Sequence, residues 1–154
     1  MIPTQDYMKG YLQGIAQMNM SGNCSLDYDL DEIPATGTLV ESVCKYMQLS
    51  PGQVSLDRLQ QWEQPLLDLL PRWLFYRLHE GTIPASEQNT LHYDEEQASR
   101  QFIHILKEWL SREGSSATVF RVNSKPDSFY ELEWDDYLFF TNGKLYFLHF
   151  GRSD

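Results

Sequence analysis

Cysteine is scarce in this 154-residue chain, which contains only Cys24 and Cys44. They show neither C-x-x-C spacing nor the density of a secreted disulfide scaffold, so we expect two free thiols in a reducing compartment, with pairing between them as the alternative. No hydrophobic run is long enough to cross a bilayer, and the first residues lack the basic and apolar regions of a signal peptide. These absences predict a cytoplasmic protein without a membrane partner.

The sequence also lacks the short motifs of nucleotide and nucleophilic chemistry. There is no P-loop, no dinucleotide glycine motif, no kinase signature and no G-x-S-x-G nucleophile elbow. We therefore expect no catalytic residue, no cofactor and no bound metal, and we interpret the protein as a non-enzyme. The histidines are scattered and form no spaced set of metal ligands: His79, His92, His104 and His149.

Basic residues are missing from two acidic stretches of the chain. Residues 10–44 and 126–143 contain ten acidic residues and no Lys or Arg, so they account for the whole formal net charge of −10. An uncompensated acidic surface repels nucleic acid and attracts basic molecules. The sequence therefore predicts a basic protein partner and argues against nucleic acid.

Nine residues of these stretches are the ones that we expect to contact the partner. Tyr28 would supply apolar contact between charges, as aromatic residues do at interface hot spots. The acids near residue 133 would share one exposed strand face, with a bulge or a strand end at the adjacent aspartates. In the alternative interpretation the acids are only solvated and discourage edge-to-edge aggregation. The candidates are Asp27, Tyr28, Asp29, Asp31, Glu32, Glu131, Glu133, Asp135 and Asp136.

Asp27, Asp29 and Asp31 have the spacing of the first ligands of an EF-hand calcium loop. Such a loop needs Gly at its sixth position and Glu at its twelfth, where this sequence has Glu32 and Thr38. The pattern therefore fails as a calcium motif. We interpret these aspartates as part of a solvated acidic connection over residues 21–37.

Helical periodicity dominates the chain as far as Gly114. Apolar residues recur there at three- and four-residue steps, as on a helix with a buried stripe. Ser55 predicts the start of a short helix, Pro71 predicts a kink or two successive helices, and Asp94 with Gln97 forms a capping box. The predicted helices span residues 4–19, 38–49, 55–64, 65–79 and 94–114.

After Gly114 the apolar period changes to two, which predicts strands over residues 117–122, 129–141 and 144–150. Asn142 and Gly143 predict a type I′ hairpin, because both tolerate a positive φ. The predicted fold is therefore a single α+β domain over residues 1–154, with N-terminal helices packed on a small C-terminal antiparallel β-meander. The turn predicts these facing pairs: Glu133 with Arg152, Asp136 with His149, Tyr137 with Leu148, Leu138 with Phe147, Phe139 with Tyr146 and Phe140 with Leu145.

The predicted pairing of Asp136 with His149 supports an alternative function. A carboxylate that holds an imidazole in one tautomer is half of a general-base arrangement, although no nucleophile accompanies it here. A small enzyme or ligand-binding domain with a site around Asp136 and His149 is therefore the alternative to a binding module. His104 and Glu108, four residues apart, could also bind a metal, but we interpret them as an exposed polar pair.

In size, charge and lack of catalytic residues the chain resembles bacterial immunity proteins, which block toxins by covering a basic active site. The resemblance is one of class and transfers no functional residues. It implies an immunity or inhibitor protein that neutralises a toxin. A third interpretation is an adaptor or assembly factor for a basic complex.

Overall fold

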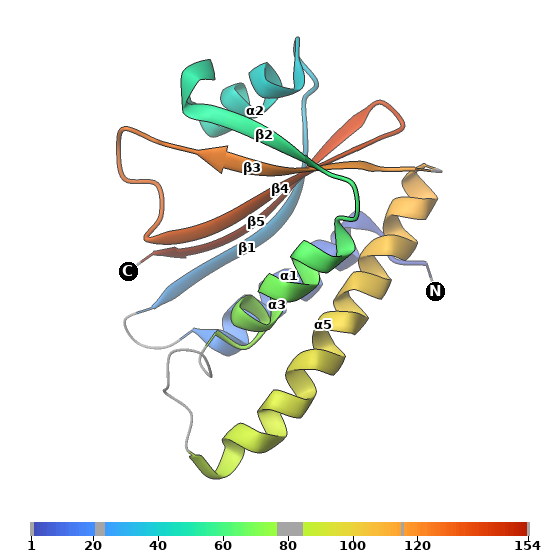
Figure 1. Cartoon of the computed structure of the whole chain (residues 1–154), viewed down its shortest axis with the longest axis vertical. Helices are drawn as coiled ribbons and strands as arrows, with labels where there is room; N and C mark the ends of the chain where they lie inside the picture. Colours follow the sequence, from blue (N-terminus) through green and yellow to red (C-terminus); the bar gives the residue numbers. More distant parts are fainter. Residues whose placement is uncertain (1, 21–23, 77–84, 115, 154) are drawn as a thin grey trace.

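The computed structural model describes the backbone of residues 2–20, 24–76, 85–114 and 116–153, and the side chains of the same residues except 85–94 (Figure 1). Within these ranges, four α-helices and five antiparallel strands confirm the predicted α+β class. None of the described helices is long and apolar enough to cross a membrane.

The strands form one antiparallel sheet in the order β1-β5-β4-β3-β2. The last three strands form the predicted meander, and β1 and β2 extend it at the two edges. This order places the C-terminal strand β5 between β1 and β4, so that β5 contacts both acidic stretches. The strands are β1 (Ser25–Ile33), β2 (Val54–Leu59), β3 (Thr118–Ser124), β4 (Glu133–Thr141) and β5 (Lys144–Ser153).

The edge strands correct two predictions. Residues 21–37 were expected to be a connection, but β1 pairs with β5 over its whole length, and its apolar residues alternate with its acids. Ser55 was expected to begin a helix, but it lies in β2, which pairs with β3. In both cases pairing along a neighbouring strand overrides the weak local preference for a loop or a helix.

Four helices flank the sheet: α1 (Gln5–Asn19), α2 (Leu39–Met47), α3 (Glu63–Leu74) and α5 (Ala85–Glu113). Helices α1 and α2 lie where the sequence predicted helices over residues 4–19 and 38–49, with Thr4 capping α1 and Thr38 forming a capping box with α2. Helix α3 contains Pro71 and ends soon after it. The predicted helix start at Asp94 is wrong: α5 begins at Ala85, and Asp94 lies inside it. The side chains of His79, His92 and Asp94 lie outside the described residues.

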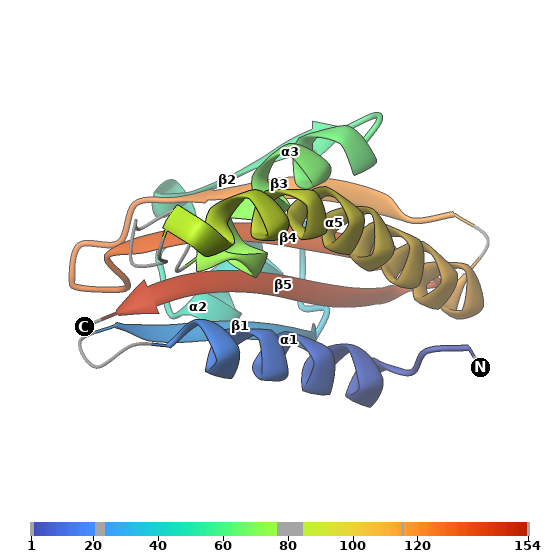
Figure 2. The same cartoon turned by 90° about the horizontal axis from the view of Figure 1, so that it is seen from below.

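The helices cover the two faces of the sheet unequally. Helices α1, α3 and α5 lie on one face, and α2 lies on the other (Figures 1 and 2). The first face has a large aromatic core in which Tyr28, Trp73 and Phe150 have ring centroids 5.2 to 5.9 Å apart. A smaller apolar cluster joins α2 to the opposite face. This smaller cluster includes Phe147, and His149 follows Phe147 on the same face of β5.

The predicted hairpin and its register are confirmed. Asn142 has φ 50° and Gly143 has φ 75°, and every facing pair that the turn predicted is present. The pairing of β4 with β5 is continuous through Asp135 and Asp136, so the expected bulge or strand end there is wrong. The two adjacent aspartates instead point to opposite faces of the sheet.

Replacing Gly143 by Val is expected to lower the free energy of unfolding by more than about 1 kcal/mol. A Cβ at this position meets no atom within 4 Å, so the cost comes from holding a β-branched residue at φ 75°. Urea denaturation monitored by circular dichroism measures the change. The control is Gly52→Val, where a Cβ also meets nothing and φ is not positive. Equal stability losses in the two variants would contradict the explanation.

Candidate functional site

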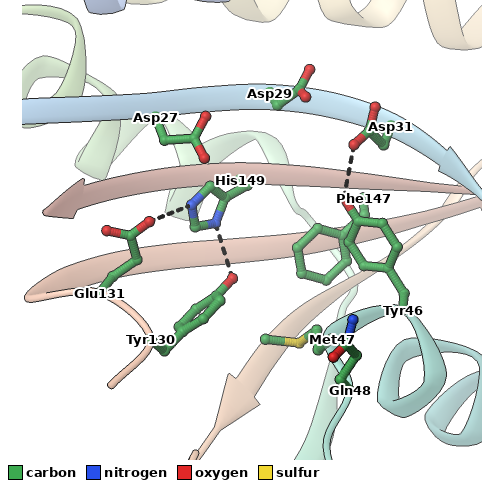
Figure 3. A pocket seen from close by; sticks show the side chains of 10 residues that line it. All are labelled: Asp27, Asp29, Asp31, Tyr46, Met47, Gln48, Tyr130, Glu131, Phe147 and His149. Atoms are coloured by element: carbon green, nitrogen blue, oxygen red, sulfur yellow. Dashed lines mark hydrogen bonds and ion pairs between the residues drawn. The ribbon is translucent and has the colours of Figure 1, made fainter. Parts of the chain in front are cut away.

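A pocket of about 370 Å³ opens on the α2 face of the sheet (Figure 3). Its volume lies within the range of small-molecule and side-chain pockets. Strands β1 and β5, the C-terminal end of α2 and the segment before β4 contribute its walls. The lining residues are Asp27, Asp29, Asp31, Tyr46, Met47, Gln48, Tyr130, Glu131, Phe147 and His149.

Strand β1 supplies three of the pocket's carboxylates. Asp27, Asp29 and Asp31 point to the pocket because alternate side chains of a strand share a face, and the apolar residues between them are buried under the helices. The register places Asp29 opposite His149 and Asp31 opposite Phe147. The three aspartates therefore form the wall of the pocket that lies beside β5.

His149 forms the buried floor of the pocket. Only 8% of the residue is exposed, and its Nδ1 lies 2.6 Å from Oδ1 of Asp136, which is 1% exposed. The Tyr130 hydroxyl lies 3.3 Å from the same nitrogen and 3.4 Å from the second oxygen of Asp136. Asp136 therefore holds the ring so that the other nitrogen, Nε2, faces the pocket.

The surrounding carboxylates determine the charge of His149. Burial alone would lower the pKa of His149, but the hydrogen bonds to Asp136 and Glu131 and the charge of Asp136 raise it to about 10. Burial raises the pKa of the Asp136 carboxyl, and its bond to His149 opposes that rise. The raised pKa favours the protonated imidazole, whereas a general base requires the neutral form.

Two of the β1 aspartates are already paired within the chain. Lys9 of α1 reaches around the edge strand, and its Nζ lies 2.5 Å from Asp31 and 3.3 Å from Asp29. Tyr46 donates a hydrogen bond to Asp31 at 2.8 Å. Burial alone would raise the pKa of Asp31, but the bonds from Lys9 and Tyr46 outweigh burial and lower it.

Asp27 and Glu131 are the pocket acids beside His149 that lack a Lys or Arg partner among the described residues. In the part of the chain that the structure describes, neither has an ion pair with Lys or Arg. Glu131 lies 3.7 Å from Nε2 of His149 through its Oε1. Its other oxygen is buried and has no hydrogen-bond partner among the described residues.

Gly151 makes room for this arrangement. It follows His149 on the same face of β5, and a Cβ built on it would overlap the His149 ring, with Cε1 at 2.8 Å, and would come within 3.0 Å of the Glu131 carboxyl carbon. Sequence reasoning overlooked this glycine. The available signal was a glycine inside a strand pattern, which often marks a close approach by another group.

The structure divides the second acidic stretch between the two faces of the sheet, which corrects the expected single exposed face. Glu131 and Asp136 belong to the pocket side. Glu133 accepts a hydrogen bond from Tyr76 at 2.8 Å and pairs with Arg72 at 2.9 Å. Asp135 pairs with Arg121 at 2.8 Å. Glu133 and Asp135 are therefore compensated by bases from other segments of the chain.

Tyr28 and Glu32 also lie away from the pocket. Tyr28 was expected to offer apolar contact to a partner, but it is 1% exposed and belongs to the aromatic core. Glu32 is exposed, and the register pairs it with Tyr146, which belongs to the helix-covered face. The loop prediction missed this division because it did not apply the two-residue period of a strand.

The structure also places the other candidate pairs. Asp136 and His149 meet as the register predicted, but the described residues that line the pocket include no Ser, Thr or Cys nucleophile. His104 lies 3.4 Å from Glu108 on the exposed side of α5, where both side chains are about half exposed or more.

Comparison of the chain with protein-family models, curated proteins and solved structures finds no match. The residues that line the pocket are therefore the main indication of function.

Proposed function

We propose that the protein is a protein-binding module whose acidic pocket takes a positively charged side chain from a basic partner. The observation that carries this proposal is the convergence of the two acidic stretches. Residues 27–31 and residue 131 lie far apart in the sequence, yet their carboxylates line one pocket around His149 (Figure 3). A concave site lined by one sign of charge concentrates ligands of the opposite sign.

The charge distribution indicates where the cationic group binds. Lys9 already partly neutralises Asp29 and Asp31, whereas Asp27 and Glu131 have no Lys or Arg partner in the described ranges. We therefore expect the cation to lie between Asp27 and Glu131. Guanidinium is favoured over ammonium, because its planar set of donors can serve two carboxylates and it stacks on aromatic rings.

The aromatic walls suit the rest of such a side chain. Tyr46 and Phe147 have ring centroids 5.1 Å apart, and with Tyr130 they line the pocket. The alkyl stem of an arginine would pack against these rings, and a cation near an aromatic face gains about 0.5–2 kcal/mol. An acidic pocket with aromatic walls is therefore better suited to an organic cation than to a small inorganic anion.

Two exposed apolar residues adjacent in sequence to pocket residues favour a protein over a free small molecule as the partner. Phe129 is 71% exposed and Leu132 is 48% exposed, and both neighbour the pocket residues Tyr130 and Glu131 in the sequence. Exposed apolar and aromatic side chains are enriched at protein interfaces. An inhibitor that covers the basic active site of a toxin, the class that the sequence resembles, would use such a surface.

The test is an NMR titration with a short peptide that contains one arginine, compared with the same peptide containing citrulline. Citrulline keeps the shape of arginine but lacks its charge. With a metal chelator present, we expect only the arginine peptide to cause saturable shifts at Tyr46, Phe147 and His149. Asp27→Asn and Glu131→Gln should each weaken binding at least threefold, since each removes a negative charge that has no Lys or Arg partner among the described residues.

The matched control is Glu32→Gln on the same strand as Asp27 but on the opposite face, which should leave the affinity unchanged. Raising the salt concentration should weaken binding of the arginine peptide, because exposed charges are screened. Equal shifts with the arginine and citrulline peptides, or shifts confined to residues outside the pocket, would contradict the proposal.

A further inference from the structure

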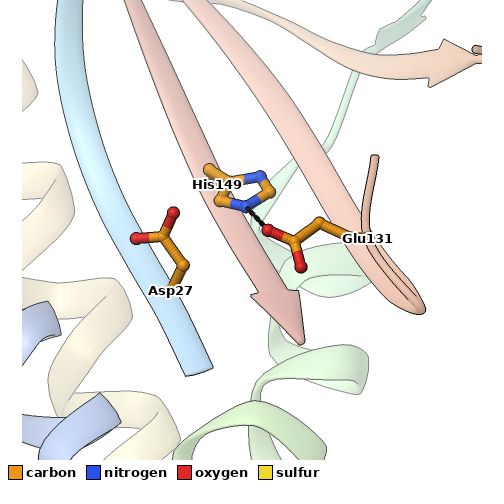
Figure 4. A group of neighbouring side chains, drawn as sticks. All are labelled: Asp27, Glu131 and His149. Carbon is orange, nitrogen blue, oxygen red and sulfur yellow. Dashed lines mark ion pairs between the residues drawn. The ribbon is translucent and has the colours of Figure 1, made fainter. Parts of the chain in front are cut away.

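We infer that Asp27, Glu131 and His149 form a binding site for a divalent transition metal ion, and that Zn²⁺ is the ion this ligand set fits best. The ion would use the two carboxylates that the proposed function assigns to the cation of the partner, so the metal and that side chain would compete for one site. One ligand atom from each residue lies within 4.8 Å of the others, and the three side chains point toward a common space (Figure 4). They come from β1, from the segment before β4 and from β5, so the fold assembles the site from three separate parts of the chain.

The first supporting observation is the orientation of His149. Asp136 binds its Nδ1 at 2.6 Å, which leaves Nε2 directed at Glu131 at 3.7 Å. Metal-binding histidines are commonly held in this way, with the second ring nitrogen donating to a carboxylate. Because the Asp136 side chain is fully buried, this support is rigid and is present before any metal binds.

The second observation is the state of Glu131. Its side chain is only 11% exposed, and its Oε2 is buried without a hydrogen-bond partner among the described residues. A buried carboxylate oxygen without a donor is unfavourable, and a cation would satisfy it. Asp27 is exposed and completes the group from the solvent side, so an ion could enter from the open pocket.

The third observation is the space above Gly151. This space is occupied by the imidazole of His149 and the carboxyl of Glu131, which a Cβ at position 151 would displace. Gly151 is therefore a positioning residue for two of the three ligands. A glycine here lets the two groups converge over the backbone of β5.

The chemistry of the ligands favours Zn²⁺ over Mg²⁺ or Ca²⁺. One imidazole nitrogen with two carboxylates suits a borderline-soft ion, whereas Mg²⁺ and Ca²⁺ prefer oxygen ligands alone. Tetrahedral zinc with bonds of about 2.0–2.2 Å separates its ligands by roughly 3.4 Å, so rotation of the exposed Asp27 side chain can close the remaining distance. On binding, the ion replaces the proton at Nε2, which passes to solvent, and one coordination position stays open.

The test uses metal-free protein and Zn²⁺ alone, with no peptide, so that its result is separate from that of the arginine titration. Calorimetry in competition with a chromophoric chelator should show one bound ion for each chain. Asp27→Asn, Glu131→Gln and His149→Ala should each weaken binding at least tenfold. Asp136→Asn should weaken it about 10- to 100-fold, since loss of such a supporting carboxylate has that effect in other zinc sites.

Gly151→Ala is the most specific variant, because it retains every ligand and displaces them, and it should weaken Zn²⁺ binding at least tenfold. The matched controls are His104→Ala, which removes an exposed histidine beside an acid, and Glu32→Gln, and both should bind within twofold of the parent protein. Circular dichroism checks the fold of each variant, and the exposed Asp27→Asn remains informative if a buried variant unfolds. Absence of one-to-one binding, or binding lost in His104→Ala and retained in His149→Ala, would overturn the inference.

Discussion

Replacing Asp136 by Ala is expected to lower the free energy of unfolding by about 3–5 kcal/mol, as measured by urea denaturation. The carboxylate is 1% exposed and bonds His149 at 2.6 Å, so its removal leaves an imidazole buried beside Glu131 without its main partner. Removing one member of a buried pair is costly because the other keeps its desolvation penalty.

A double-mutant cycle shows whether this loss belongs to the pair. Asp136→Ala combined with His149→Ala should cost less than the sum of the single losses, with a coupling of about 0.5–3 kcal/mol. Asp127→Ala, which removes an exposed acid of the same stretch, should change stability by no more than about 0.5 kcal/mol. Additive losses in the cycle would contradict the pairing on which the site depends.

Replacing Tyr28 by Ala is expected to cost about 3–5 kcal/mol of unfolding free energy, the usual range for deleting a buried aromatic ring. Tyr28 packs edge-on against Trp73 and Phe150, with ring centroids 5.8 and 5.2 Å away. Its hydroxyl donates to the Trp73 carbonyl at 2.7 Å. Thermal and urea denaturation should both report the loss.

Tyr28→Phe separates packing from surface function. It keeps the ring and removes one hydrogen bond, so it should cost only about 1 kcal/mol. Because the ring lies beneath the helices and not in the pocket, this variant should bind the arginine peptide with unchanged affinity. Weaker peptide binding by a folded Tyr28→Phe variant would instead indicate that Tyr28 contacts the partner, as the sequence predicted.

Local chemistry explains the predictions that were confirmed. The helices predicted over residues 4–19 and 38–49 follow from apolar residues at three- and four-residue steps, and the hairpin follows from two adjacent residues with positive φ. That turn then set the whole register of β4 and β5, including the contact of Asp136 with His149. Such features depend on residues that are close in sequence.

Non-local pairing explains the predictions that were wrong. Strand β1 contains four acids among its nine residues and becomes a strand because β5 offers it nine consecutive partners. Strand β2 depends in the same way on β3, which lies more than fifty residues further along the chain. Neither partner can be recognised from the local sequence of the segment itself.

The α+β class, the C-terminal hairpin and the two acidic stretches without Lys or Arg can be read from the sequence, because composition, periodicity and turn chemistry act over short distances. Which of those acids find a Lys or Arg partner depends on contacts between distant segments. The tertiary structure supplies Arg72 and Arg121 to the acids on one face and Lys9 to two on the other. Asp27 and Glu131 are left facing His149, since the sheet order places β5 between the two acidic stretches.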